Sequence, residues 1–327
     1  MKVLVTGGGG FVGGAIIDQL LARDCQVRSV ARNEYPSLVS KGVEVMRGDL
    51  ADDDVAARAV AGCDAVFHVA AKAGVFGSAA DYERSNVVAT HMVVDAARAA
   101  GVTRLIYTST PSVVHGGGDV EGVDESASYP DHFTAPYPDT KARAEQYVLG
   151  QADDGFATVA IRPHLVWGPG DTQLVPRIIE RARTGKVRFV GDGSNIVDTT
   201  FIDNAAAAHL NAFDRLDPAG PISGKAYFVA QDEPRPIRDI VNDLIGSAGL
   251  PPITKTIPVP IAYAAGSAAE WWYSRFRPDG EPPMTRFLAE QLATAHWFDL
   301  TAARTELGYV PEVSFREGVD RLRESYA

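Results

Sequence analysis

Residues 2–13, KVLVTGGGGFVG, decide the fold of this chain. After the opening lysine, residues 3–6 form a short apolar run without polar alternation, as in a strand buried on both faces. Four glycines follow, and an apolar run at helical spacing then extends to Leu21. A strand, a glycine turn and a helix in this order predict the first unit of an α/β fold.

The glycines of this stretch have the spacing of a phosphate cradle. Gly7 allows a tight turn, Gly10 lets the backbone approach a diphosphate closely, and Gly13 lets the helix pack near the strand. The diphosphate would lie at the start of the helix, beside Phe11 and Val12, where free backbone N–H groups favour an anion. We therefore predict a dinucleotide-binding site here.

Strand and helix patterns alternate along the first half of the chain. We predict further strands at 26–31, 43–46, 64–69, 103–108 and 157–162, and helices at 13–23, 52–61, 85–100 and 137–150. This alternation is typical of βαβ units, so the predicted fold is a Rossmann-type, doubly wound parallel sheet of the α/β class.

The alternation stops near residue 165, where proline becomes frequent and the sequence between helical patterns becomes irregular. We predict a dinucleotide-binding domain at 1–166, with returning segments near 197–212 and 225–231. A smaller, mostly helical substrate-binding lobe is predicted at 167–327.

Composition limits the classes of function. The chain has 327 residues and a formal net charge of −11, which argues against a general nucleic-acid binder because such proteins present a basic face to phosphates. Cys25 and Cys63 are too few for a disulfide framework or a zinc site, and the chain opens without a signal-peptide pattern. No apolar run has the length of a membrane span. We expect a cytoplasmic protein with no metal site.

The ends of the second and third strands bear on the choice of cofactor. NAD is usually held by a carboxylate after the second strand, whereas a cation accommodates the 2′-phosphate of NADP. Here Arg32 occupies that position, so we predict NADP(H) in preference to NAD(H). Asp49, followed by Leu50, ends the third strand, where its carboxylate can accept a hydrogen bond from the adenine amino group.

Tyr137 and Lys141 lie one turn apart on a predicted helix and therefore face the same side. The ammonium can lower the pKa of the phenol from about 10, so that Tyr137 exchanges a proton near neutral pH while Lys141 holds a ribose hydroxyl. Upstream, Ser109 and Thr110 follow a predicted strand at the sheet edge where doubly wound folds bind ligands. Their hydroxyls can hold a substrate carbonyl beside the tyrosine.

The glycine cradle, the hydroxyls and Tyr-x-x-x-Lys, in this order, resemble the extended short-chain dehydrogenase/reductase superfamily across essentially the whole chain. The resemblance implies that Ala70 and Ala71 form a loop facing the cofactor. It also implies that Asn86 has a structural and proton-relay role and that Pro163 ends a strand beside the nicotinamide.

Shorter motifs resemble one branch of the superfamily. YTSTPSV at 107–113 and GEPP at 280–283 are similar to the 3β-hydroxysteroid dehydrogenase-like branch. AAKAG at 70–74 and PMTRF at 283–287 resemble the bacterial 2-alkyl-3-oxoalkanoate reductases of long-chain olefin and β-lactone biosynthesis. That resemblance implies NADPH-dependent reduction of the 3-keto group of an α-alkylated β-keto acid. The usual serine of the superfamily matches Thr110, which leaves open whether Thr110 or its neighbour polarises the carbonyl.

A β-keto acid with two alkyl chains needs a cation for its carboxylate and an apolar surface for its tails. Lys72, Arg177 and Arg286 are candidates for the cation, and the run 261–276, which includes Trp271, is a candidate for the surface. The alternatives are a surface role for the lysine and core packing or a subunit contact for the aromatic run. The resemblance also implies a homodimer and allows association with other enzymes of the same pathway.

Three other functions stay open. A sugar-nucleotide epimerase or dehydratase has the same fold, but it expects a carboxylate after the second strand, where this chain has Arg32. A 3β-hydroxysteroid dehydrogenase belongs to the same branch. A dinucleotide-sensing protein without catalysis would keep the glycine cradle, but such proteins usually lose the tyrosine and the lysine that this chain retains.

Overall fold

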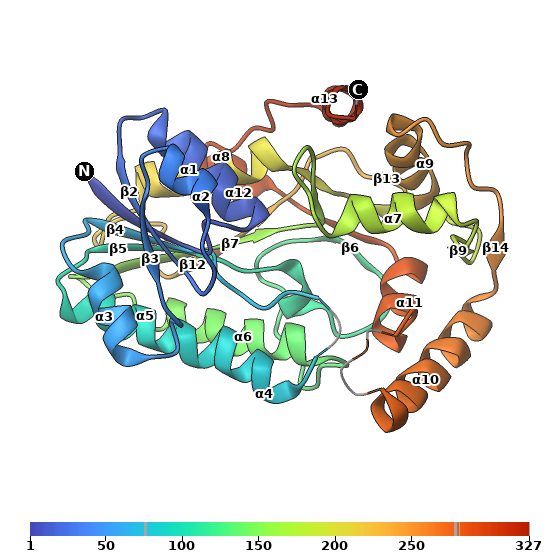
Figure 1. The fold of residues 1–327 in the computed structure, drawn as a ribbon, viewed down its shortest axis with the longest axis horizontal. Helices are drawn as coiled ribbons and strands as arrows, with labels where there is room; N and C mark the ends of the chain where they lie inside the picture. Colours follow the sequence, from blue (N-terminus) through green and yellow to red (C-terminus); the bar gives the residue numbers. More distant parts are fainter. Residues whose placement is uncertain (75–76, 278–279, 281, 327) are drawn as a thin grey trace.

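A computed structural model describes residues 1–74, 77–277, 280 and 282–326 (Figure 1). Glu281 of the GEPP motif therefore lies outside the described residues. The glycine turn, residues 103–110 and the complete Tyr-x-x-x-Lys helix lie within the described residues.

A seven-stranded parallel sheet forms the centre of the molecule, which confirms the predicted doubly wound α/β fold. Its order is β12-β7-β5-β4-β1-β2-β3, so neighbouring strands are joined by crossovers on both sides of β1. The strands are β1 (Lys2–Thr6), β2 (Gln26–Ala31), β3 (Glu44–Arg47), β4 (Ala65–His68), β5 (Arg104–Thr108), β7 (Ala157–Pro163) and β12 (Lys225–Val229).

Helices cover both faces of this sheet (Figure 1). Successive residues of β1 point to opposite faces, so Val3 and Val5 join one apolar core and Leu4 joins the other. The first core lies under α1 (Phe11–Leu21), α2 (Pro36–Ser40), α8 (Ile202–Arg215) and α12 (Thr301–Leu307). The second lies under α3 (Asp53–Val60), α5 (Ala89–Ala99) and α6 (Pro136–Leu149). Burial of β1 on both sides explains its continuous apolar sequence.

Most of the remaining elements lie in the part of the molecule to the right of the central sheet in Figure 1. Its helices are α7 (Leu174–Arg183), α9 (Ile237–Ser247), α10 (Val259–Phe276), α11 (Arg286–Ala293) and α13 (Phe315–Glu324). Its short strands are β6 (Val120–Val123), β8 (Val166–Trp167), β9 (Phe189–Val190), β10 (Ile196–Val197), β11 (Thr200–Phe201), β13 (Arg235–Pro236), β14 (Thr256–Ile257) and β15 (His296–Phe298).

Strand pairing crosses the predicted division at residue 166 in both directions. The edge strand β12 returns to the central sheet beside β7, and β6 leaves the first part of the chain to pair with β15. The four-stranded sheet β13-β10-β15-β6 also adds a strand component to a region predicted as mostly helical. The division into two domains stays a prediction.

The predicted helix 85–100 has a more complex start. A short α4 (Ala79–Tyr82) leads into a π-helical turn, η1 (Glu83–Val88), before α5 continues the helix. π-turns are often found at functional sites because the extra residue displaces a side chain from regular helical register. This turn carries Asn86.

Two further observations concern membranes and metals. Within the described ranges, no helix is long and apolar enough to cross a membrane. Among the same residues, no group of three or more His, Cys, Asp or Glu side chains could hold a metal ion. Cys25 and Cys63 are both free thiols.

Candidate active site

The glycine turn after β1 has no room for side chains at two positions. Gly7 has a left-handed φ of +69°, and a Cβ atom there would lie 2.9 Å from the backbone of Ala70. A Cβ atom on Gly13 would lie 2.4 Å from the carbonyl oxygen of Gly7. The predicted roles of Gly7 in the turn and of Gly13 in helix packing therefore agree with the local geometry.

The start of α1 is open to an anion. Gly10 is the N-cap residue with extended backbone, no side chain caps the helix, and the first turn carries no acidic residue. The N–H group of Gly10 donates to the Gly7 carbonyl at 2.9 Å. The N–H groups of Phe11, Val12 and Gly13 belong to the first turn, so they have no carbonyl partner within the helix. An uncapped N-terminus with this polarity fits a diphosphate, as in a nicotinamide dinucleotide.

The surface that follows β2, next to the glycine turn, carries Arg32 and Arg47 and one carboxylate, Glu34. Arg32 is exposed and forms no ion pair within the part of the chain that the structure describes. The Tyr35 ring lies against Gly9, where a Cβ would be 2.2 Å from the ring, and Arg47 Nε donates to the Arg32 carbonyl at 3.2 Å. A cavity of about 550 Å³ adjoins them, lined by Asn33, Glu34, Tyr35, Pro36, Val39, Ser40, Val45 and Arg47.

Asp49 is held at the end of β3, while Leu50 beside it is buried. Its Oδ1 accepts from the Ala51 N–H at 3.0 Å and its Oδ2 lies 3.1 Å from Arg84 Nε. Burial on its own would raise the pKa of Asp49, but these two partners bring it below the ordinary value. The carboxylate is therefore ionised and directed by Arg84.

Tyr137 and Lys141 lie on one face of α6, as the spacing predicts. Lys141 is 2% exposed, its Nζ donates to the Thr108 carbonyl at 2.6 Å, and it lies 4.1 Å from the centre of the Tyr107 ring. Burial lowers its pKa to about 7, against a smaller opposing effect of Glu145. Such an amine gains or loses its charge near neutral pH.

The expected lowering of the Tyr137 pKa is not found in the protein alone. Burial raises the pKa of Tyr137, and a hydrogen bond with the Thr110 side chain opposes this only in part. The physical reason is that Lys141 is buried too, is bound to the Thr108 carbonyl and holds a proton weakly.

Of the two candidate hydroxyls, Thr110 contacts Tyr137. Thr110 Oγ1 also lies 3.2 Å from Ser112 Oγ and caps the short 3₁₀ helix η2 (Pro111–Val114) by accepting from the Ser112 N–H. Ser109 Oγ is buried and makes no hydrogen bond to the described residues. Ser112 was not predicted as a site residue, although its place two residues after Thr110 was a usable signal.

Asn86 links the loop after β4 to the tyrosine helix. Its Oδ1 accepts from the Lys72 N–H at 2.7 Å, and its Nδ2 donates to the Lys72 carbonyl at 3.1 Å. The same Nδ2 donates to Thr140 Oγ1 at 3.1 Å, and Thr140 Oγ1 bonds back to the Pro136 carbonyl at 2.8 Å. The amide therefore fixes two chain segments on either side of the site.

His68 connects the same network to β1. Thr90 Oγ1 donates to the Asn86 carbonyl at 2.6 Å, so it accepts from His68 Nε2 at 2.9 Å. His68 Nδ1 then accepts from the Thr6 hydroxyl at 2.9 Å, and that oxygen accepts the N–H groups of Val69 and Ala70 at 3.0 Å. Burial, aided by the charge of Lys141, lowers the pKa of His68 to about 3, so the ring stays neutral.

Glu145 forms a buried ion pair behind Lys141 that sequence reasoning missed. Both of its oxygens accept from Arg162, at 3.0 and 2.6 Å, and Oε1 also accepts from the Tyr129 hydroxyl at 2.6 Å. Glu145 is fully buried and Arg162 is 2% exposed. A signal existed, because Glu145 stands one turn after Lys141 and thus two turns after Tyr137.

The predicted substrate residues either pair with carboxylates or are exposed, and Lys72 also lies 5.2 Å from the centre of the Tyr82 ring, which contacts the Tyr137 ring. Lys72 Nζ pairs with Asp81 at 3.0 Å, and Arg286 Nε pairs with Glu270 at 2.7 Å. Arg177 is an exposed residue of α7, and Trp271 is 66% exposed on α10. Of the other predicted residues, Pro163 is buried at the end of β7, Ala70 contacts the glycine turn, and Ala71 is exposed.

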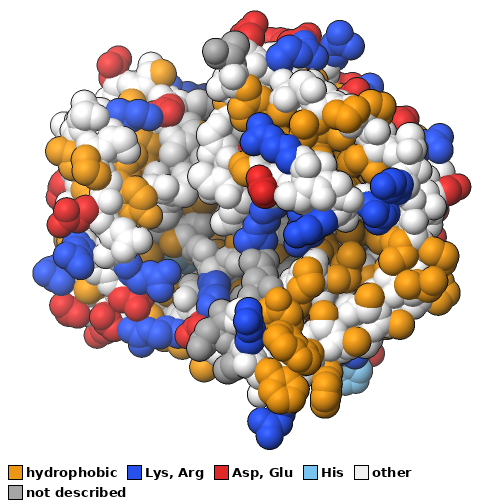
Figure 2. All heavy atoms as spheres, turned by 45° about the vertical axis from the view of Figure 1, so that its right-hand side comes forward, with side chains coloured by type: hydrophobic (Ala, Val, Ile, Leu, Met, Phe, Trp, Pro, Cys, Tyr) orange, Lys and Arg blue, Asp and Glu red, His pale blue; other side chains and the backbone are white. Residues whose placement is uncertain are grey.

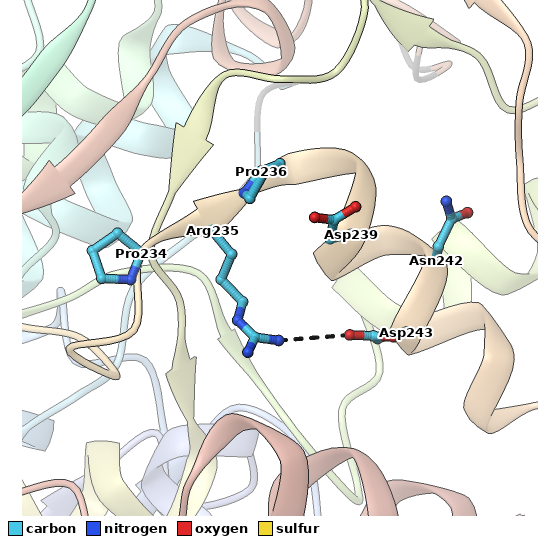
Figure 3. Close-up of a pocket in the computed structure, with 6 residues that line it drawn as sticks. All are labelled: Pro234, Arg235, Pro236, Asp239, Asn242 and Asp243. Carbon is cyan, nitrogen blue, oxygen red and sulfur yellow. Dashed lines mark ion pairs between the residues drawn. The ribbon is translucent and has the colours of Figure 1, made fainter.

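A second cavity lies away from all of these residues. Its volume is about 520 Å³, and it is formed by β13 and the first turns of α9 (Figure 3). The lining residues are Pro234, Arg235, Pro236, Asp239, Asn242 and Asp243. Arg235 reaches Asp243 at 3.6 Å, and no predicted site residue lines the cavity.

The fold and the site are those of a nicotinamide-dependent oxidoreductase of the extended short-chain dehydrogenase/reductase type. The chain belongs to the 3-beta hydroxysteroid dehydrogenase/isomerase family, whose sequence pattern matches residues 4–259. The predicted resemblance to this branch is therefore confirmed.

Particular relatives are closer still. The chain is 53% identical to a 2-alkyl-3-oxoalkanoate reductase of Stenotrophomonas maltophilia, with all of both chains covered. It is 43% identical to a 2-alkyl-3-oxoalkanoate reductase of Shewanella oneidensis, with 98% of this chain and 85% of that one covered. Among solved structures, MoeE5 in complex with UDP-glucose and NAD is 25% identical, covers 99% of this chain with 98% of its own, and superposes with a TM-score of 0.75.

Proposed function

We propose that the protein reduces the 3-keto group of a 2-alkyl-3-oxoalkanoic acid to the 3-hydroxy acid, with NADPH as cofactor, in long-chain olefin or β-lactone biosynthesis. The observation that carries this proposal is the placing of Tyr137 and the buried Lys141 one turn apart on α6, with Lys141 bound to the Thr108 carbonyl at the sheet edge that Ser109 and Thr110 follow. Identity of 53% to a reductase of this name supports the choice of substrate.

The side chains have distinct proposed roles. A bound nicotinamide would supply the hydride, and Thr110 would orient the ketone oxygen toward Tyr137. Because burial raises the pKa of Tyr137, the phenol is protonated at neutral pH and can donate to the oxygen as negative charge develops there. Lys141 would bind the ribose, and a nearby anionic cofactor would favour its ammonium form. Its charge would then stabilise the phenolate that Tyr137 becomes.

Asn86 would act by positioning and not by direct proton transfer. Both ends of its amide are engaged by Lys72 backbone groups and by Thr140. The backbone carbonyl of Asn86 accepts from the Thr90 hydroxyl. We infer that the amide keeps α6 and the loop 69–72 in register around the cofactor.

The preference for NADP(H) rests on Arg32. Arg32 is exposed after β2 and has no ion-pair partner among the described residues. The strand it follows is tied to the glycine turn, because the Val30 carbonyl accepts from the Gly7 N–H at 3.4 Å. A 2′-phosphate would pair with Arg32, whereas the ribose diol of NAD would find no carboxylate at this position. Arg32→Asp is expected to raise the KM for NADPH by at least about tenfold and to lower the KM for NADH.

We further propose a cytoplasmic enzyme that forms a homodimer through the outer faces of α5 and α6. We also propose that the protein associates with other enzymes of the same pathway, one of which would deliver the keto acid to it. Size-exclusion chromatography with light scattering tests the dimer, and a monomer at micromolar concentration would contradict it.

The proposed reaction is tested by following NADPH oxidation with a panel of ketones. The panel contains 2-alkyl-3-keto acids of several chain lengths, ketosteroids and UDP-sugars. We expect turnover with the keto acids alone. Tyr137→Phe should bind NADPH as the unchanged protein does and lose turnover by about 10²- to 10⁴-fold. Normal turnover in that variant, or reduction of the ketosteroids in place of the keto acids, would overturn the proposal.

A further inference from the structure

Helix α10 exposes an apolar surface where a helix of this kind normally exposes polar residues. Of its 18 residues only Ala262 and Gly266 are buried, and Gly266 packs so closely on the Thr285 backbone that a Cβ would lie 2.7 Å from it. The helix is therefore fixed along one narrow line, and most of its circumference is exposed.

Exposed apolar residues occur along the whole length of α10. Six large apolar side chains of this helix are exposed by 41–66%, more than on the rest of the described chain together. They are Val259, Ile261, Tyr263, Trp271, Trp272 and Phe276. Residues 261, 265, 268, 272 and 276 form one stripe at helical spacing, and all five are apolar. Figure 2 shows a group of apolar side chains at the lower right of the face that it draws.

A band of cations adjoins this apolar side. Residues 177–188, which cover most of α7 and the loop after it, contain five Lys or Arg residues and one carboxylate. Within the described ranges, Arg181, Arg183, Lys186 and Arg188 form no ion pair with any carboxylate. The band is tied to α10, because β9, which follows it, pairs with β14 just before the helix. Figure 2 shows Lys and Arg side chains beside the apolar group.

The end of α10 has the same character. Arg275 and Arg277 lie 5.7 Å from the ring centres of Phe276 and Trp272, respectively. The one carboxylate of the helix, Glu270, is paired with Arg286 at 2.7 Å. Aromatic rings with cations beside them are favoured at a lipid interface, where the rings reach the acyl boundary and the cations meet phosphate groups.

We propose that α10, flanked by the 177–188 band, is the surface by which this enzyme docks on an anionic lipid membrane. The helix would lie in the plane of the interface with its aromatic side chains inserted and the basic band over the headgroups. The chain as a whole has a net charge of −11, so a local cluster of cations indicates that this surface binds an anionic partner.

A second copy of the chain fits this surface less well. An 18-residue helix is about 27 Å long, and a strip roughly 10 Å wide along it offers only roughly 300 Å². A stable protein interface needs roughly 800 Å² from each partner. An isologous contact would also bring the two basic bands together. A membrane has neither limitation.

Vesicle sedimentation with the full-length protein tests the proposal. Vesicles of phosphatidylcholine alone are compared with vesicles that also contain phosphatidylglycerol. We expect sedimentation with the anionic vesicles, loss of binding at high salt, and a blue shift of tryptophan fluorescence on binding. Trp272→Gln with Phe276→Gln should weaken the partition constant by at least about tenfold. Arg183→Gln with Lys186→Gln should weaken it about fivefold per residue at low salt.

The control is Val310→Gln, which removes an apolar side chain that is 65% exposed elsewhere on the surface. It should bind vesicles as the unchanged protein does. Absence of binding to anionic vesicles overturns the proposal, as does binding that the Trp272 and Phe276 changes leave intact. A lipid-free dimer that those two changes dissociate assigns the surface to a second copy and also overturns it. The measurement needs no substrate, so it stands apart from the proposed reaction.

Discussion

Helices α6 and α10 distribute their side chains in opposite ways. α6 buries an ammonium, a carboxylate and a hydroxyl, namely Lys141, Glu145 and Thr140, and supplies each with a partner inside the molecule. α10 buries almost nothing and exposes Trp271 by 66% and Phe276 by 57%. Buried polar groups are tolerated where they have hydrogen-bond or ion-pair partners within the protein. A group of exposed aromatic side chains instead marks a site where another molecule binds. Both departures from ordinary burial coincide with a proposed function.

The largest expected effect is a loss of turnover when a buried residue of α6 is replaced. Lys141→Met removes the ammonium without changing the size of the side chain greatly. Turnover should fall by about 10²- to 10⁴-fold, because neither ribose nor phenolate would have a cation. Steady-state kinetics with NADPH and a 2-alkyl-3-keto acid checks this result. Retention of more than a tenth of the activity would remove Lys141 from the mechanism.

The same residue sets a pH dependence. The pKa of Lys141 is about 7 in the folded protein, so its ammonium form is lost as pH rises through that value. Affinity for NADPH, followed by cofactor fluorescence, should therefore decrease as pH rises through about 7. The step should vanish in Lys141→Met. It should move to lower pH in Glu145→Gln, because the Glu145 charge raises the lysine pKa. A flat profile from pH 6 to 9 would contradict this assignment.

A large effect on stability is expected from the ion pair beneath Lys141. Glu145→Gln leaves the buried Arg162 without its charged partner, and we expect a loss of about 3–5 kcal/mol in the free energy of unfolding. Urea denaturation measures it. Replacing both residues, with Glu145→Leu and Arg162→Met, should cost less than Glu145→Gln alone. A larger loss in the double variant would show that the pair stabilises the fold beyond mutual neutralisation.

A smaller effect is expected at the network that joins the cofactor loop to α6. Asn86→Ala leaves the partly buried Lys72 N–H and the buried Thr140 without their amide partner, which should cost about 1–3 kcal/mol of unfolding free energy. If Asn86 positions the site, kcat should fall more than NADPH affinity does, and Asn86→Asp should restore part of it by accepting from Lys72. Equal losses in both quantities would leave Asn86 with a purely structural role.

The smallest effect is expected on stability when an exposed residue of α10 is replaced. Phe276→Gln should change the free energy of unfolding by no more than about 0.5 kcal/mol, because the ring is 57% exposed. Thermal unfolding without lipid checks this value. A loss of several kcal/mol would show that the aromatic side of α10 packs on the molecule and is not an open surface.

Much of the fold could be predicted because it follows from the spacing of apolar residues and glycines over short stretches of sequence. The strands β1 and β2, the glycine turn and the Tyr137–Lys141 face depend on residues a few positions apart. The π-turn at Asn86 and the pairing of β6 with β15 could not be predicted in the same way. The first depends on one extra residue in a helix, and the second joins segments more than 170 residues apart. The predicted lowering of the Tyr137 pKa is not found in the protein alone, because Lys141 is itself buried and holds its proton weakly there.

The sequence by itself determined the parallel sheet, the cradle at Gly7 and Gly13, and the placing of a phenol and an amine on one helix face. These features follow from side-chain size and spacing within one or two turns, which act locally. Only the tertiary structure decided that Glu145 meets Arg162, that Asn86 meets Thr140, and that the aromatic run of α10 faces outward. Partners and exposure depend on which distant segments pack together, and the charge state of a buried group follows from that packing.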